Sequence, residues 1–156
     1  MIEFVTGNIL DCPAEVLVNP VNCVGVMGRG LALQIRNVFP ENFVAYKAAC
    51  RRGIVRPGHV FGVEVGSPGL LRWIVNFPTK RHWRDRSRIE DIEEGLGDLV
   101  RFLREIQGGS VAVPALGCGL GGLDWETEVR PRIEKALGPM DEVRAFVFAP
   151  GGLTRD

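Results

Sequence analysis

One loop of this sequence gathers the side chains best suited to chemistry on an anionic substrate. Residues 80–88 hold Lys80 and four arginines against one acid, Asp85, although the whole chain has 19 basic and 19 acidic residues. A lysine amine can act as a nucleophile or as a proton donor, and arginines contact phosphate groups. His82 and Trp83 add rings on which a base can stack. The alternative interpretation of such a run is a solvated charged loop without a ligand.

Two glycine-rich segments each follow an apolar run and lead into a helical pattern. They are residues 19–30, N-P-V-N-C-V-G-V-M-G-R-G, and residues 114–125, P-A-L-G-C-G-L-G-G-L-D-W. Glycine lets backbone N–H groups approach an anion closely, and the N-terminus of a helix adds a positive dipole. Two such loops facing each other can hold a pyrophosphate, whereas glycines that only make tight turns are the competing interpretation. Neither segment matches a Walker loop or a dinucleotide-binding G-x-G-x-x-G motif.

The elements that must position these loops follow from the hydrophobic pattern. Apolar runs predict strands at residues 2–6, 16–19, 60–65, 73–77, 111–114 and 143–149. Helices are predicted at residues 30–38, 42–51, 87–107 and 125–137, and Ser87 with Glu90 predicts a capping box at the start of the third. This mixture indicates an α/β layer fold with one mixed sheet and helices on both faces. In such folds, ligands bind in the loops at the carboxyl ends of the strands.

The composition is that of a single globular domain over residues 1–156, with a short frayed tail expected after about residue 150. The four cysteines form no C-x-x-C pair, and neither histidine has a carboxylate cluster beside it. We therefore expect free thiols and no metal site. No apolar run is long enough to cross a membrane and no signal peptide is recognisable, so we expect a cytoplasmic protein without a membrane partner. We also expect a monomer.

Taken together, these motifs resemble those of the macrodomain family. The resemblance covers nearly the whole chain and rests on T-G-N-I, V-N-P-V-N, G-V-M-G-R-G-L-A and V-P-A-L-G-C-G-L-G-G-L-D-W. It implies a three-layer α/β/α sandwich with a mixed central sheet that binds ADP-ribose as ligand or product, without a cofactor. Asn8 stands where the family usually has aspartate, and its amide oxygen can accept a hydrogen bond from the adenine amino group. The residues that the resemblance assigns to ADP-ribose are Asn8, Ile9, Gly28, Arg29, Gly30, Leu31, Thr79, Gly117, Cys118, Gly119, Leu120 and Gly121.

The segments G-V-M-G-R-G-L-A, N-F-P-T-K and G-C-G-L resemble the terminal glycohydrolase branch, and most closely the members that remove ADP-ribose from DNA bases. That resemblance implies an antitoxin that reverses the work of a partner DNA ADP-ribosyltransferase, usually on thymine in single-stranded DNA. The basic loop would then contact the DNA that flanks the modified base. A non-catalytic ADP-ribose reader and a hydrolase of protein-linked ADP-ribose or O-acetyl-ADP-ribose are the alternatives. The DNA contacts expected in this loop are Arg81, His82, Trp83, Arg84 and Arg86.

The same resemblance assigns catalytic roles to Lys80 and Asn22. Lys80 stands at the catalytic lysine of the branch, where it would attack the anomeric carbon of the distal ribose or protonate the leaving base. Phosphate binding alone is its alternative role. Asn22 would hydrogen-bond the distal ribose, and its alternative is a turn asparagine. Gly121 occupies the position of a branch aspartate, so we expect Lys80 to act with a hydroxyl or a phosphate of the substrate.

Overall fold

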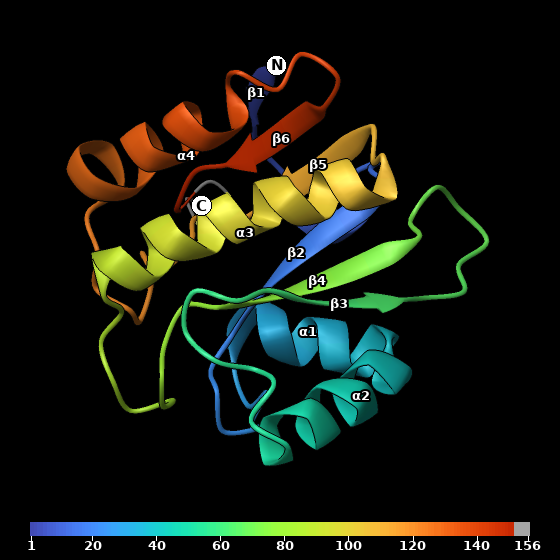
Figure 1. The fold of residues 1–156 in the computed structure, drawn as a ribbon, viewed down its shortest axis with the longest axis vertical. Coiled ribbons are helices and arrows are strands. Elements are labelled where there is room, and N and C mark those ends of the chain that lie inside the picture. The colour runs from blue at the N-terminus through green and yellow to red at the C-terminus, as the bar shows by residue number, and fades with distance from the viewer. Residues whose placement is uncertain (152–156) are drawn as a thin grey trace.

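The computed structural model describes residues 1–151 as one six-stranded sheet between two layers of helices (Figure 1). The strand order is β1-β6-β5-β2-β4-β3, and every neighbouring pair is parallel except β3 with β4. The predicted mixed sheet is therefore confirmed, while residues 152–156 of the expected frayed tail lie outside the described residues. The strands are β1 Ile2–Val5, β2 Val16–Val21, β3 Phe61–Glu64, β4 Trp73–Pro78, β5 Ser110–Val113 and β6 Arg144–Phe148.

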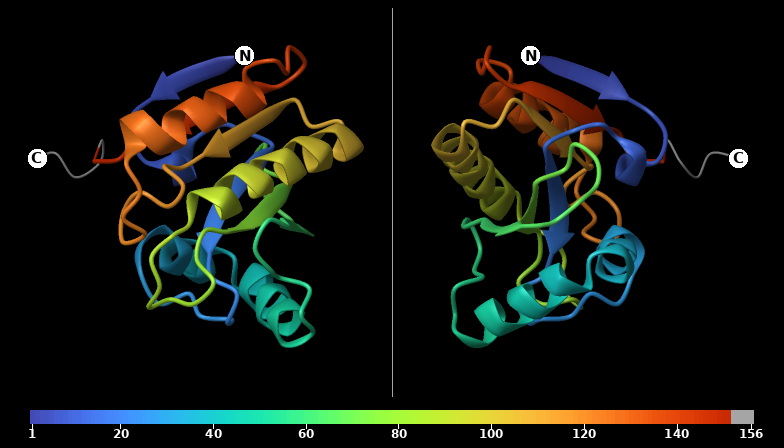
Figure 2. Two further views of the ribbon diagram at one scale, coloured as in Figure 1. Left: turned by 60° about the vertical axis from the view of Figure 1, so that its left-hand side comes forward. Right: turned by 90° about the vertical axis from the view of Figure 1, so that its right-hand side faces the viewer.

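Helices cover both faces of the sheet, as predicted. The views in Figure 2 show α1 (Gly30–Val38) and α2 (Pro40–Arg51) on one face, with α3 (Ile89–Ile106) and α4 (Arg130–Leu137) on the other. The second helix begins two residues earlier than predicted, because Pro40 suits the first turn of a helix. The last predicted helix is divided into a π turn at Trp125–Val129 and α4. None of the helices within residues 1–151 is both long enough and apolar enough to cross a membrane.

The core follows from the alternation of side chains along the buried strands. On β2, Val16 and Val18 face α3 and α4, whereas Leu17 faces the layer that contains α1. Burial on both faces explains why this strand reads as a continuous apolar run. The apolar stripe of α3 packs on the first side, and Gly95 lets it approach closely, because a Cβ there would lie 2.5 Å from the Phe77 ring.

The capping box predicted for Ser87 and Glu90 is wrong. The helix α3 begins after Arg88, whose extended backbone makes the cap without a side-chain hydrogen bond. Ser87 turns away from the helix, and its N–H donates to the carbonyl oxygen of Gly121 at 3.0 Å. Its buried hydroxyl has no hydrogen-bond partner within residues 1–151. A contact with a distant loop has therefore displaced the local capping preference of this serine.

Candidate functional site

The basic loop, residues 79–88, leaves the carboxyl end of β4 and lies beside the glycine-rich segment of residues 19–30, here called the first glycine loop. Thr79 continues the parallel pairing of β4 with β2, since its N–H donates to the carbonyl oxygen of Val21 at 2.8 Å. Further on, the N–H of Cys23 donates to the carbonyl oxygen of Arg81 at 3.3 Å. The Cys23 thiol also lies 3.6 Å from the carbonyl oxygen of Lys80, and burial raises its pKa to about 11, so it remains a protonated donor. These contacts hold Lys80 against the loop that follows β2.

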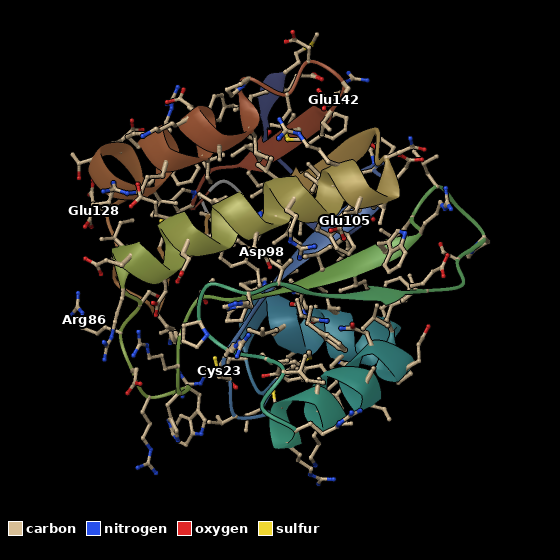
Figure 3. The ribbon with its side chains drawn as sticks, in the orientation of Figure 1. Cys23, Arg86, Asp98, Glu105, Glu128 and Glu142 are labelled. Carbon is tan, nitrogen blue, oxygen red and sulfur yellow. The ribbon has the colours of Figure 1, made fainter. Side chains whose placement is uncertain are left out.

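The other end of the basic loop contacts the glycine-rich segment of residues 114–125, here called the second glycine loop. Besides the bond from Ser87 to Gly121, the Arg86 guanidinium donates to the carbonyl oxygen of Gly122 at 3.3 Å. Cys23 and Arg86, labelled in Figure 3, thus mark the two flanks of the basic loop. The basic loop therefore contacts both glycine-rich segments at the shared carboxyl edge of β2, β4 and β5, and Lys80 lies at the end of the loop that contacts the first of them.

Lys80 is half-buried, with its amine directed along the basic loop. Its Nζ donates to the carbonyl oxygen of Trp83 at 3.4 Å. In the part of the chain that the structure describes, no carboxylate forms an ion pair with Lys80. The amine is therefore not held by an acidic side chain and is available to a substrate.

Asn22 builds the turn of the first glycine loop. Its Oδ1 accepts from the Val24 N–H at 3.0 Å and from the Tyr46 hydroxyl at 2.8 Å, while its Nδ2 donates to the Val26 carbonyl oxygen at 2.8 Å. Burial raises the pKa of Tyr46, which keeps the hydroxyl protonated as a donor. Asn22 therefore makes the hydrogen bonds of a turn asparagine. Its second amide hydrogen has no acceptor in residues 1–151, so the predicted ribose contact stays a prediction.

The second glycine loop is shaped by residues with positive φ and by one very tight contact. Gly117 and Gly122 have φ of +74° and +80°, which favour glycine. A Cβ on Gly121 would overlap the Ser87 hydroxyl and lie 2.5 Å from the Gly117 carbonyl oxygen. No side chain, the aspartate of the related branch included, can therefore be placed at this position without moving the loop. Within it, burial raises the pKa of Cys118 to about 11, in keeping with a neutral filler rather than a nucleophile.

Substitution of Gly121 by alanine is expected to lower the free energy of unfolding by about 2 kcal/mol, because the added methyl overpacks the loop. ADP-ribose affinity should fall with it, since the backbone N–H groups of the loop shift. Gly119→Ala is the matched control, because a Cβ there meets no atom within 4 Å. Urea unfolding of both variants checks the expectation, and equal stability of the two would contradict the steric account.

A hollow of about 270 Å³ opens beside the glycine loops, between the ends of β1, β5 and β6 and the start of α1. The predicted ligand residues Ile9, Gly30 and Leu31 line it. Asn8 stands next to it on the surface, where its Oδ1 accepts from the Leu10 N–H at 3.0 Å. The apolar lining suits a flat aromatic ring such as adenine. The lining residues that the sequence did not predict are Val5, Thr6, Gly7, Gln34, Pro114, Ala115, Phe148, Ala149, Pro150 and Gly151.

Gly28 and Arg29 are exposed immediately before α1, and Arg29 occupies the N-cap of that helix without a side-chain cap. Leu120 is also exposed, at the tip of the second glycine loop. The predicted ADP-ribose residues thus lie in or next to the hollow, in the two glycine loops and, for Thr79, at the start of the basic loop, and all of them follow the carboxyl ends of strands.

The predicted DNA contacts fall into two structural groups. Arg81 forms a two-pronged ion pair with Asp91 on α3, at 3.1 and 3.2 Å, and Arg86 binds the second glycine loop. These two arginines hold the basic loop in place. Trp83 and Arg84 are instead presented to solvent, with Trp83 48% exposed and the Arg84 guanidinium 4.6 Å above its ring. The His82 ring lies against Trp83, with centroids 5.1 Å apart and ring planes tilted by 33°.

Three buried asparagines form a hydrogen-bonded network beneath the carboxyl edge of the sheet. Asn76 on β4 accepts from the Nδ2 atoms of Asn19 on β2 and Asn42 on α2, both at 3.1 Å. It donates to the Asn42 side-chain oxygen at 2.9 Å and to the Phe61 carbonyl oxygen at 3.1 Å. All three side chains are fully buried. The amide network therefore joins the strands that end at the first glycine loop and at Lys80.

This chain is similar in sequence to a known family and to named proteins. A family model described as Macro domain matches residues 18–131. A DNA ADP-ribosyl glycohydrolase of Thermus aquaticus is 50% identical over 150 residues, which are 96% of this chain and 41% of that protein. The Mycobacterium tuberculosis protein of the same name is 48% identical over 155 residues, 99% of this chain and 44% of that protein. The chain thus spans less than half the length of these relatives.

Solved structures agree with the sequence matches. The macrodomain of Mycobacterium tuberculosis DarG superposes with a TM-score of 0.93 and 48% identity, covering 96% of this chain and 98% of that one. Thermosipho africanus DarTG in complex with ADP-ribose gives a TM-score of 0.87 and 32% identity, covering 96% of this chain and 42% of that one. By its sequence, its three-layer fold and its two glycine loops, this chain belongs to the macro domain family.

Proposed function

We propose that this domain is an ADP-ribosyl glycohydrolase that removes ADP-ribose from bases of single-stranded DNA. The observation that carries the proposal is the place of Lys80, held against the first glycine loop and directly beside the exposed Trp83–Arg84 pair. Its 48–50% identity to proteins named DNA ADP-ribosyl glycohydrolase supports the same reaction. A chain of Thermosipho africanus that is 35% identical is named as a fusion of such a glycohydrolase with a DNA ADP-ribosyl transferase. That fusion supports a transferase toxin as the partner, with this domain as part of its antitoxin.

The geometry suggests how the substrate lies. Adenine occupies the apolar hollow beside Ile9 and Leu31, and the diphosphate meets the N–H groups of the glycine loops. The distal ribose then extends towards Lys80, with Asn22 beside it. The reaction breaks the bond between the anomeric carbon and a base nitrogen, and water supplies the hydroxyl that replaces the base. Lys80 takes part either as the neutral amine that attacks the anomeric carbon or as the ammonium that protonates the departing base.

The exposed Trp83–Arg84 pair is the part of the site that distinguishes DNA from other ADP-ribosylated substrates. A base next to the modified one can stack on Trp83, and Arg84 can neutralise an adjacent phosphate. A free ADP-ribose molecule or a modified glutamate side chain offers neither group. The basic loop therefore supports nucleic acid as the substrate class, and its opening arginine, Arg81, serves to hold the loop.

Substitution of Trp83 by alanine together with Arg84 by glutamine is expected to reduce kcat/KM on ADP-ribosylated single-stranded DNA by about 30-fold or more, since stacking on one base contributes about 1–3 kcal/mol. Release from a protein-linked substrate should change by less than about threefold, because that substrate lacks the neighbouring base and phosphate. Arg104→Gln, an exposed change on α3, is the control. Equal losses on the DNA-linked and protein-linked substrates would exclude DNA as the preferred substrate.

A further inference from the structure

The net charge of this chain is zero, but two parts of the sequence carry net charges of opposite sign. Residues 16–84 contain ten lysines and arginines but only two acids, Glu41 and Glu64. The remaining residues contain nine lysines and arginines and 17 acids. The first half therefore carries a formal charge of +8 and the rest of the chain −8, which is a strong asymmetry for a domain of this size.

The fold turns this division of the sequence into a division of the surface. Residues 16–84 supply β2, β4 and β3, which are adjacent at one side of the sheet, together with α1, α2 and the start of the basic loop. The remaining described residues supply β1, β6 and β5 with α3 and α4 (Figure 1). The acids labelled in Figure 3 all belong to the second half: Asp98 and Glu105 on α3, Glu128 in the π turn before α4, and Glu142 in the loop between α4 and β6.

A second basic surface, outside the site described above, lies at the end of α2 and in the loop that follows it. The arginines there are Arg51, Arg52 and Arg56, and Lys47 lies one turn earlier on the helix. All four side chains are exposed, and none forms an ion pair within residues 1–151. Residues 42–63 contain no acid at all. We call these four residues the α2 basic surface.

The α2 basic surface is continuous with the basic loop. A Cβ on Gly25 would lie 3.5 Å from the Lys47 side chain, so the first glycine loop packs directly on α2. Two residues earlier, Cys23 contacts the backbone of Lys80 and Arg81. Only the first glycine loop therefore lies between the proposed catalytic lysine and α2.

A groove follows the same surface towards β3. It has a volume of about 440 Å³, and Arg56 and His59 line one wall of it. The opposite wall comes from α3, where Asp98 accepts from the Val60 N–H at 2.8 Å and from the Arg101 guanidinium at 2.6 Å. Asp98 is thereby neutralised by its own partners, which leaves Arg56 as the unpaired charge of the groove.

We propose that the α2 basic surface binds the phosphates of the single-stranded DNA that flanks the modified base. This inference rests on the proposed function and adds a path for the strand beyond the Trp83–Arg84 pair. The strand leaves the site over the basic loop, passes the first glycine loop and lies along the end of α2. The acidic half repels the same phosphates, so the charge division both attracts the strand and fixes the side on which it lies.

The test compares two double variants that each remove two exposed positive charges. Arg51→Gln with Arg52→Gln alters the α2 basic surface, and Arg104→Gln with Lys135→Gln alters the acidic half. Binding to unmodified single-stranded oligonucleotides of about 6 and about 20 nucleotides is measured over a range of salt concentrations. For the longer oligonucleotide, the α2 variant should lose about tenfold in affinity at low salt and about 1.4 in the slope of log K against log salt, the value for two phosphate contacts. The shorter oligonucleotide and free ADP-ribose should bind it as they bind the unaltered protein.

Equal losses for the two double variants, or no loss for the α2 variant on the longer strand, would overturn the inference. Its failure is separable from that of the proposed function, because release of ADP-ribose from a short modified oligonucleotide tests the reaction without the flanking strand. A protein that releases ADP-ribose but shows no α2 effect keeps its function and loses the proposed path. A protein that binds the long strand through α2 but releases nothing keeps the surface and loses the reaction.

Discussion

Replacing Lys80 with alanine is expected to reduce the release of ADP-ribose from a modified oligonucleotide by at least about 10³-fold, within the range found for side chains that transfer protons or attack the substrate. The affinity for free ADP-ribose should change by less than about threefold, because the hollow and the N–H groups of the glycine loops provide most of the ligand contacts. Lys80 is half-buried and makes one hydrogen bond, to the Trp83 carbonyl oxygen, so its loss should leave the fold intact. Single-turnover release and calorimetric binding on the same preparation measure the two effects separately.

Lys80→Arg separates chemistry from phosphate binding. Arginine keeps the positive charge but remains protonated at any working pH, so it cannot attack the anomeric carbon and is a poor acid. If Lys80 only binds phosphate, Lys80→Arg should retain most of the activity while Lys80→Ala loses it. If Lys80 acts chemically, both variants should be inactive. A covalent ADP-ribosyl adduct on Lys80, found by mass spectrometry after reduction, would identify the attacking role, and its absence in an active enzyme would identify the acid.

The largest expected effect on stability concerns the asparagine network. Asn76→Leu should lower the free energy of unfolding by about 4 kcal/mol, since each buried polar group left without a partner costs about 1–3 kcal/mol. The change removes the partner of the Asn19 amide, of the Asn42 side chain and of the Phe61 carbonyl in one step. Asn37→Leu, the same change at an exposed site on α1, should cost less than about 0.5 kcal/mol and serves as the control. Similar urea midpoints for the two variants would show that the network contributes little.

The order and type of the elements could be predicted from hydrophobic pattern alone, because the central strands are buried on both faces and α3 has a continuous apolar stripe. Some boundaries of the strands and helices could not be predicted in this way. The strand β2 was expected to end at Asn19, before a proline, yet it continues through Pro20, which pairs with Phe77 of β4. Its pairing with β5 is confined to the register Val16–Val111 and Leu17–Ala112, so Pro20 lies beyond that ladder and removes no bond from it.

The site was predictable to the extent that its residues stand in motifs. Glycine-rich loops and a lysine after a strand are visible in the sequence, and the order of a parallel sheet then brings them to one edge. The contacts that shape the site were not visible, because they join residues far apart in the chain. Two examples are the hydrogen bond between Ser87 and Gly121 and the ion pair between Arg81 and Asp91. These tertiary contacts cannot be predicted from the local spacing of residues.

The far wall of the hollow was missed for a related reason. Phe148 and the residues after it follow the final strand, and nothing in their types marks a ligand site. The final apolar run was the one indication in the sequence. A strand there that pairs in parallel with β5 ends at the same edge of the sheet as β5 does. A helix residue such as Gln34 offered no signal of this kind.

One incubation tests most directly whether the protein releases ADP-ribose from DNA. A single-stranded oligonucleotide carrying ADP-ribose on thymine is mixed with the protein and with the Lys80→Ala variant, and free ADP-ribose and unmodified oligonucleotide are quantified. We predict stoichiometric recovery of both products with the unaltered protein and none with the variant. Tight binding of the modified oligonucleotide by both proteins, with no product from either, would contradict the glycohydrolase and identify a reader of ADP-ribose.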